Sequence, residues 1–133
     1  MLEGHGQKYI KSYIAGFFDG EGCITAYFPK NSHDRVRCVI TITNTNKQIL
    51  TVIQKIYGGK IYKHGKINKQ CFVLHLSMLN TMDFLYDICD YLIDKKVQAE
   101  LAIEFLGYTT TNRGQWKDEI AEYYVNKISE AKR

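Results

Sequence analysis

The sequence contains no long apolar run. No stretch approaches the roughly 20 apolar residues that a helix needs to cross a bilayer, so we expect no membrane contact. The N-terminal residues Met1–Lys11 are polar and include glycine, which argues against a signal peptide. We therefore expect the protein in the cytoplasm, or in the matrix or stroma of an organelle if the gene is organellar, and not outside the cell.

Paired cysteines are also missing. The four cysteines form no CxxC pair and lie far apart, each among apolar neighbours, at Cys23, Cys38, Cys71 and Cys89. This pattern is typical of reduced and mostly buried thiols in a reducing compartment. A zinc site built from these thiols with His64 and His75 is disfavoured, because the paired ligand spacing of zinc sites is absent.

Acidic residues are nearly absent from the middle of the chain. Between Gly22 and Met82 one acid, Asp34, accompanies nine basic residues, so this stretch carries a net charge of +8. The rest of the chain has nine basic and thirteen acidic residues, which gives −4. The nine central basic residues are Lys30, Arg35, Arg37, Lys47, Lys55, Lys60, Lys63, Lys66 and Lys69. This polarity predicts one basic surface that binds a polyanion, whereas a merely solvated basic face explains the missing acids less well.

What the sequence does contain is enough for one core. Its 133 residues are 45% apolar and 13% aromatic, which suits a globular domain rather than a disordered tail. There is no long linker, low-complexity segment or internal repeat. We expect a single domain over residues 1–133, with a core from about 8 to 105 and a C-terminal helix from about 115 to 131.

Helical and strand periodicities alternate along the first half of the chain. Residues 12–19 predict a helix that ends near Gly20 or Gly22, since glycine commonly stops a helix. Residues 24–28 and 35–43 alternate between apolar and polar side chains, which predicts a hairpin with one dry and one polar face. Asn46 is the candidate cap of a helix that ends at Gly58 and Gly59.

The second half begins with two more strands, expected at residues 60–64 and 70–76. Asn80 or Thr81 is expected to cap a helix whose apolar positions extend to Leu92. A further helix is expected from Asp94 to Gly107, and then a loop over residues 109–114. The last helix is marked by residues at helical spacing, namely Trp116, Ile120, Tyr124 and Ile128.

These elements predict an α+β fold with the order αββαββα and a C-terminal helical extension. The two hairpins are expected to form one antiparallel sheet with helices on one face. The other face is too polar to bury, and such an exposed basic surface suits the major groove of DNA. The residues expected to contact DNA from this face are Thr25, Tyr27, Arg35, Arg37, Thr41, Lys60, Tyr62, His64, Val73 and His75.

The segment from Ile14 to Gly22 reads IAGFFDGEG and is followed by Cys23 and Ile24. It resembles the LAGLIDADG motif of homing endonucleases and intron maturases, and the predicted order of elements fits that family over roughly residues 8–105. The resemblance implies the LAGLIDADG homing-endonuclease fold, with a saddle-shaped antiparallel sheet. It also implies an enzyme that hydrolyses double-stranded DNA at a specific site, across the minor groove, as in intron homing.

The chain carries a single copy of this motif. The family packs two motif helices against each other, so the resemblance implies a homodimer and a near-palindromic DNA target. Gly16 and Gly20 have the small-xxx-small spacing that lets two helices approach closely. The expected dimer contacts are Tyr13, Gly16, Phe17 and Gly20.

By this resemblance the metal-binding acid is Glu21, where the family usually has aspartate, and the backbone carbonyl of Gly20 helps to bind the metal. Mg²⁺ suits these hard oxygen ligands; Mn²⁺ is expected to replace it, and Ca²⁺ to bind without supporting cleavage. The resemblance gives Asp19 a structural role at the helix end rather than a metal-binding one. Outside such a motif, Glu21 would be an ordinary solvated turn acid.

The family also places a lysine near the reacting phosphate. Lys95 is the expected match after a helix break, and Lys96 is the competing one. At the end of the second strand the family has polar and basic residues that order solvent, for which Asn44 and Lys47 are the candidates. Each of these residues has the alternative interpretation of a solvated surface side chain.

The sequence thus predicts a metal-dependent DNA endonuclease of the homing type. The first alternative is a protein of the same fold that does not cut, such as an RNA splicing cofactor (maturase) or a DNA-binding regulator. The second is an unrelated basic RNA-binding module, which leaves the motif unexplained.

Overall fold

The structure, a computed structural model, describes residues 5–30, 36–65, 70–111 and 119–132. Its elements are α1 (His5–Glu21), β1 (Gly22–Tyr27), β2 (Arg37–Asn44), α2 (Lys47–Tyr57), β3 (Lys60–His64), β4 (Cys71–Ser77), α3 (Met78–Ile88), a 3₁₀ turn (Cys89–Tyr91), α4 (Lys96–Thr111) and α5 (Glu119–Glu130). This is the order αββαββα followed by two further α-helices, so the predicted α+β class is confirmed.

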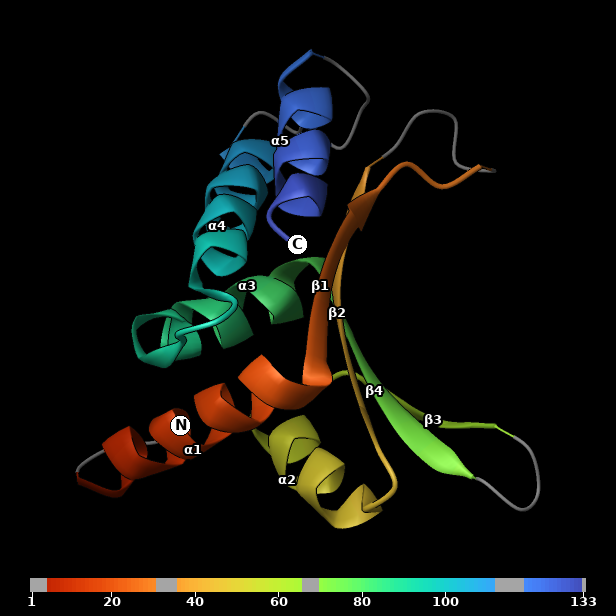
Figure 1. Cartoon of the computed structure of the whole chain (residues 1–133), viewed down its shortest axis with the longest axis vertical. Coiled ribbons are helices and arrows are strands. Elements are labelled where there is room, and N and C mark those ends of the chain that lie inside the picture. Colours follow the sequence, from red (N-terminus) through yellow and green to blue (C-terminus); the bar gives the residue numbers. More distant parts are fainter. Residues whose placement is uncertain (1–4, 31–35, 66–69, 112–118, 133) are drawn as a thin grey trace.

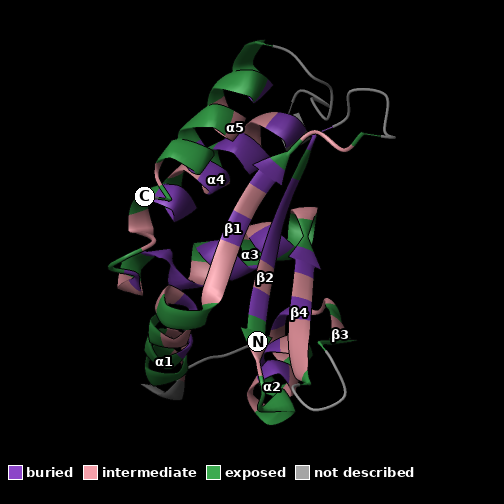
Figure 2. Cartoon of the chain, turned by 45° about the vertical axis from the view of Figure 1, so that its right-hand side comes forward, coloured by how far each residue is buried: buried purple, intermediate pink, exposed green. Residues whose placement is uncertain are grey.

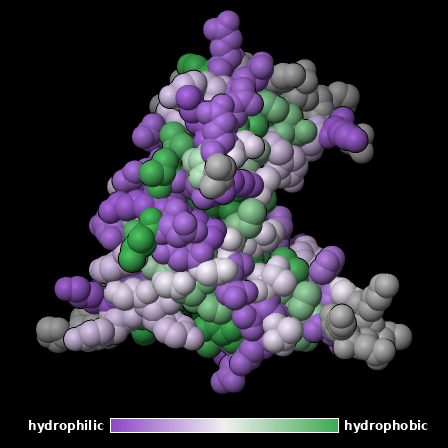
Figure 3. All heavy atoms as spheres, viewed as in Figure 1, coloured by the Kyte–Doolittle hydropathy of each residue, from purple (hydrophilic) through white to green (hydrophobic). Residues whose placement is uncertain are grey.

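The strands form one antiparallel sheet in the order β1-β2-β4-β3. Figure 1 shows the helices on one side of this sheet, while the hairpin of β3 and β4 projects away from α4 and α5. The outline of the molecule in Figure 3 is hollowed on the side away from the helices. The sheet therefore has one covered face and one open, curved face.

The core lies between the covered face and the helices. Alternate strand residues point into it and are completely buried, for example Ile24, Ile40 and Leu74, and Figure 2 shows this alternation along β1 and β4. From the helices, Phe18 and Phe84 meet edge to face with their ring centroids 5.3 Å apart. Period-two burial in the strands is what fixes which strand residues remain on the open face.

α1 passes into β1 without a loop, because Glu21 ends the helix and Gly22 begins the strand. A Cβ atom at Gly22 would lie 2.0 Å from the ring of the completely buried Phe18. Only glycine fits this close approach without displacing the core. Because no loop separates the helix from the strand, Glu21 lies directly before the first residue of β1.

α2 begins and ends where the sequence indicates. The side chain of Asn46 accepts the backbone N–H of Gln48 at 2.8 Å, which satisfies a donor at the helix start. Gly58 ends the helix with φ +87°, a conformation that favours glycine. The predicted cap and stop are both confirmed.

Other boundaries differ from the prediction. α1 begins at His5, before the expected residue 12, and Lys8, Tyr9 and Ile10 in its first half are exposed, so burial does not mark this part of the helix. α3 begins at Met78, directly after β4, so Asn80 and Thr81 are helical rather than caps. Its helix stops at Ile88, and Leu92 lies beyond the 3₁₀ turn. The chain leaves β4 through Met78 with φ +45°, a turn that has no sequence signature.

The two C-terminal helices also differ in detail. α4 begins at Lys96 rather than Asp94, whose backbone N–H is bound to the side chain of Asp19 instead. α4 continues to Thr111, so residues 109–111 are helical and not part of a loop. In α5, Ile128 is buried as expected, but Ile120 is 47% exposed. Trp116 lies outside the described residues.

Candidate nucleic-acid interface and active site

The two acids at the end of α1 have different environments. The carboxylate of Asp19 accepts three backbone N–H groups from the turn before α4, at Ile93 (2.8 Å), Asp94 (3.2 Å) and Lys95 (3.0 Å). The carboxylate of Glu21 is exposed, and no described residue forms a hydrogen bond or ion pair with it. Asp19 therefore has the structural environment expected from the sequence, and Glu21 is free to bind a ligand.

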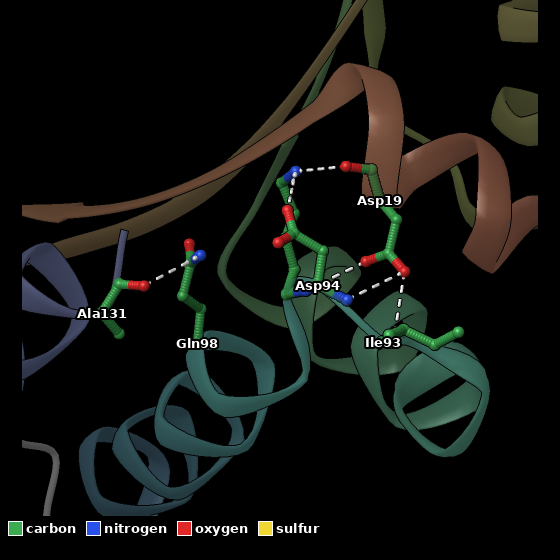
Figure 4. A network of polar contacts seen from close by, with 6 residues as sticks. Asp19, Ile93, Asp94, Gln98 and Ala131 are labelled. Carbon is green, nitrogen blue, oxygen red and sulfur yellow. Dashed lines mark hydrogen bonds and ion pairs between the residues drawn. The ribbon is translucent and has the colours of Figure 1, made fainter. Parts of the chain in front are cut away.

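Lys95 also contacts the end of α1. Its Nζ donates to the backbone carbonyl of Asp19 at 2.6 Å and lies 3.7 Å from the Asp94 carboxylate. Its side chain is 14% exposed, whereas Lys96 is the first residue of α4 and has no such contact with α1 among the described residues. Of the two candidate lysines, Lys95 is the one that lies beside the motif. Figure 4 shows this network between the end of α1 and the start of α4.

The outward face of α1 is bare. Tyr9 and Tyr13 are 75% and 62% exposed, and Cβ atoms built at Gly16 and Gly20 would meet nothing within 4 Å in the described chain. Positions 9, 13, 16 and 20 fall on one face of an α-helix. Phe17, the remaining expected dimer residue, is half-buried against the core and lies at the edge of this face.

The register of the sheet aligns the expected DNA-contacting residues on its open face. One cross-strand row runs Cys23, Thr41, His75 and Lys60, and its neighbours hold Thr25 on one side and Val73 with Tyr62 on the other. Tyr27 pairs with Arg37 at one end of the sheet, and His64 pairs with Cys71 at the other. Arg35 lies outside the described residues. All the other residues of the expected set share this face.

The basic residues of the central stretch are divided between the two sides. Arg37 and Lys60 lie on the open face, but Lys47 and Lys55 belong to α2, which covers the other face. Lys63 pairs across from Phe72, on the covered-face register. The expectation of one basic surface is therefore too broad for the described residues, because α2 carries part of the charge to the helical side.

At the α1–β1 junction, Gly22 pairs with Ile42 of β2. Asn44 lies beyond this pair as the last residue of β2, and Lys47 is the first residue of α2. The Asn44 side-chain oxygen accepts the backbone N–H of Asn46 at 2.8 Å, so it also shapes the turn into α2. Lys47 is exposed, with Nζ 5.7 Å from the centre of the Phe72 ring. No described contact joins either residue to Glu21, and their catalytic roles stay predictions.

Lys132 joins the open face from the far end of the sequence. Its Nζ lies 3.4 Å from Oγ1 of Thr25 and 3.8 Å from Sγ of Cys23, both on β1. The buried Ile128 anchors the end of α5, and the Gln98 amide donates to the carbonyl of Ala131 at 3.5 Å. The sequence gives no spacing signal for this contact. The alternation of β1 could have identified Cys23, which lies on the same face.

The described residues contain no group of three or more His, Cys, Asp or Glu arranged to hold a metal ion. All four cysteines are free thiols, of which Cys38 and Cys89 are buried. Burial raises the pKa of the Cys38 thiol to about 12, so it stays protonated at neutral pH. Among the described helices, none is both long and apolar enough to cross a membrane.

An open antiparallel sheet backed by helices, with a bare motif helix ending in a free acid, defines the fold class of the homing endonucleases. The family model for LAGLIDADG endonucleases matches residues 14–98, and the chain belongs to this family. No curated protein matches the sequence.

Solved structures share this fold. The homing endonuclease I-CvuI, in complex with its target and 2 mM Ca, has a TM-score of 0.77 and 22% identity, over 96% of this chain and 85% of that chain. The archaeal intron-encoded homing endonuclease I-Vdi141I, complexed with DNA, has a TM-score of 0.58 and 22% identity, over 94% and 98%. I-SmaMI, bound to uncleaved DNA with calcium ions, gives 0.72 and 18%, over 92% and 44%. At these identities the likeness establishes the fold.

Proposed function

We propose that this protein is a homing endonuclease that cuts both strands of a specific DNA site, across the minor groove, as a homodimer. The observation that carries the proposal is the exposed, unpaired Glu21 carboxylate at the end of the motif helix, where the Asp19 carbonyl also holds the Lys95 ammonium group. An acid left free at such a junction suits a ligand better than a stabilising role. Membership of an endonuclease family supports the same conclusion.

DNA would lie along the open face of the sheet. Antiparallel strands fit the major groove, where base edges are distinguishable, and the exposed Arg37 is a donor suited to guanine. Lys132 would add a phosphate contact at the start of β1. The hollowed outline in Figure 3 is on this side of the molecule.

A second copy would pack on the bare face of α1. Two helices with glycine at positions 16 and 20 can approach almost backbone to backbone, which brings the two Glu21 carboxylates together. A twofold axis through this contact predicts a near-palindromic target.

The donor set at this junction fits a divalent metal ion of the Mg²⁺ type. Glu21 and Gly20 are both exposed at the end of α1, and the carboxylate of the first and the backbone carbonyl of the second are hard oxygen ligands. When bound, such an ion supplies an activated water and charge neutralisation at the leaving oxygen. Lys95 would donate a hydrogen bond to the reacting phosphate, while Asn44 and Lys47 would order solvent on the other side. Mn²⁺ is expected to replace Mg²⁺, and Ca²⁺ to bind without cleavage.

The direct test is cleavage of DNA that carries the flanking sequence of the gene's own insertion site, with Mg²⁺ and with EDTA. Double-strand cutting that requires Mg²⁺ and one defined site supports the proposal. Tight, sequence-specific binding without cutting under all metals would instead favour the non-cleaving alternative. A monomer at micromolar concentration, measured by sedimentation, would overturn the dimer part.

A further inference from the structure

The end of α1 and the start of α4 cap each other. Oδ2 of Asp19 accepts the N–H groups of Ile93 and Asp94, Oδ1 accepts that of Lys95, and Nζ of Lys95 donates to the Asp19 carbonyl. Figure 4 shows the Asp19 side chain directed at the turn that precedes α4. Backbone N–H groups at a helix start and carbonyls at a helix end have no partner within the helix. Here the end of α1 supplies an acceptor for the N–H groups before α4, and Lys95 supplies a donor for a carbonyl at the end of α1.

Electrostatics favour both contacts, that of the Asp19 carboxylate with the turn before α4 and that of the Lys95 ammonium with the end of α1; together they are called the exchange below. Three successive backbone N–H groups form a concave site for an anion, and the nearby N-terminus of α4 adds a partial positive charge. The C-terminus of α1 has the opposite partial charge and stabilises the ammonium group. Asp19 and Lys95 are separated by 76 residues, so the exchange joins two distant parts of the chain.

The exchange fixes Lys95 at both its ends. Its backbone N–H is bound by Asp19, its carbonyl accepts the first helical bond of α4 from Ala99 at 2.9 Å, and its ammonium is bound at 2.6 Å. A free lysine side chain samples many rotamers, and ordering it costs up to about 2 kcal/mol. An ammonium group has three donors, so the one used on the Asp19 carbonyl leaves others for a phosphate.

We propose that Asp19 is a positioning residue for DNA cleavage: its carboxylate holds the turn that contains Lys95, and the fixed turn keeps the Lys95 ammonium at the end of α1. Asp19 itself touches neither DNA nor metal in this arrangement. The inference rests on the proposed endonuclease function. It assigns to the sixth residue of the motif a role in the reaction rate, in addition to its contribution to the fold.

A purely structural role is the competing explanation, and Asp87 offers a matched control. Asp87 also joins helices through its carboxylate: it accepts the Tyr57 hydroxyl at 2.7 Å and lies 3.7 Å from Nζ of Lys11. Burial and this hydrogen bond raise the pKa of Tyr57, so the hydroxyl remains a donor. Asp87 lies on α3, away from the Lys95 contact. Asp87→Asn should therefore lower stability without changing the cleavage rate.

The experiment compares Asp19→Asn, Asp19→Glu, Asp87→Asn, Lys95→Met and the double variant Asp19→Asn with Lys95→Met. Single-turnover cleavage at saturating enzyme should fall about 10- to 100-fold in Asp19→Asn, with the Kd for DNA in EDTA within about twofold. Asp19→Glu keeps a carboxylate and should recover part of the rate. In the double variant the two losses should not multiply, because both act through one ammonium group.

A metal-free measurement gives a second test. Acylation of lysines, read by mass spectrometry, should be slow at Lys95 in the wild type and in Asp87→Asn, and several-fold faster in Asp19→Asn. Losses that multiply in the double variant, an equal rate loss in Asp87→Asn, or unchanged Lys95 labelling would each overturn the inference. A wild-type protein that never cuts would refute the endonuclease function instead, while the labelling result would still decide whether Asp19 holds Lys95.

Discussion

The inward and outward faces of α1, the helix that carries the motif, have different surroundings. On the inward face, Ile14, Ala15 and Phe18 are at most 1% exposed and pack into the core. On the outward face, Tyr13 is 62% exposed, and Gly16 and Gly20 have open space where a side chain would be. The inward residues are explained by contacts within this chain, whereas the outward ones have no partner among the described residues.

This contrast shows that a single helix specifies both a fold and a surface. Inward positions should respond to substitution through stability, since a packed core tolerates neither cavities nor extra atoms. Outward positions should respond through assembly and chemistry while the monomer remains folded. Substitutions chosen from each face therefore test whether the two roles are separable.

The largest effect is expected at Glu21, the last residue of the helix. Glu21→Gln should lower the cleavage rate by several orders of magnitude, because the amide is a poor metal ligand and carries no charge. Its melting temperature should not change, and its affinity for target DNA in EDTA should equal or exceed that of the wild type, because a repulsive charge is removed. Glu21→Asp should retain some activity.

Glu122→Gln, which removes an exposed acid of α5, is the control for this prediction and should behave as the wild type. A Glu21→Gln protein that cuts at close to the wild-type rate would show that the motif acid does not bind the metal. The outward face would then lack the chemistry assigned to it here.

Gly16→Leu should weaken the dimer by about 100-fold, because added atoms cannot be absorbed where two backbones meet. The monomer should remain as stable as the wild type or gain stability, since the new side chain meets nothing within 4 Å of its Cβ and leucine is the better helix former. Sedimentation equilibrium and thermal unfolding measure the two effects.

Gly107→Leu is the matched control, since a Cβ at this α4 glycine also meets nothing within 4 Å. It should leave the dimer intact. Equal dimer loss in both variants would mean that the bare face of α1 is not the interface.

Gly22 tests the inward side. Gly22→Ala should reduce the free energy of unfolding by about 1–3 kcal/mol, because its Cβ would overlap the buried Phe18 ring. Gly20→Ala, two residues earlier, has open space and should be neutral or slightly stabilising in the monomer. Urea unfolding measures the free energy of unfolding of both variants. Replacing Phe18 with a smaller side chain that has no ring should restore part of the stability lost in Gly22→Ala. Equal stability of the two alanine variants would remove the distinction between the faces.

The sequence predicts those features that depend on local signals. α2 is predicted at both ends because Asn46 and Gly58 lie next to the groups that they cap. The predicted start of α3 was wrong because Ser77 makes no capping hydrogen bond and the turn depends on the unusual φ of Met78. The α4 start was wrong because Asp19, far away in the chain, binds the N–H of Asp94. A sequence pattern therefore reveals helix caps made by neighbouring residues, and it misses caps made by residues that are distant in the chain.

The same limit applies to the site. The resemblance to the motif points to Glu21 and to Lys95 ahead of Lys96, and the contact of the Lys95 ammonium with the Asp19 carbonyl favours the same order. Parity along each strand predicts the open face, and the sheet register confirms which residues share it. Parity does not reveal Lys132, which lies in the turn after α5, outside residues 14–98, and reaches Thr25 across 107 residues.

Lys132 provides the smallest and last test, because it asks whether the functional surface extends beyond the motif helix and the strands. Lys132→Gln should remove one phosphate contact per protomer, and so reduce the slope of log affinity against log salt by about 2 for the dimer. Lys127→Gln, in the last turn of the preceding α5, is the control, since its Nζ pairs with Glu130 at 3.7 Å and its side chain is 47% exposed. Affinity titrations at several salt concentrations measure both slopes. An unchanged slope in Lys132→Gln would confine DNA binding to the strands, with Lys132 serving only to fix α5 against Thr25 and Cys23.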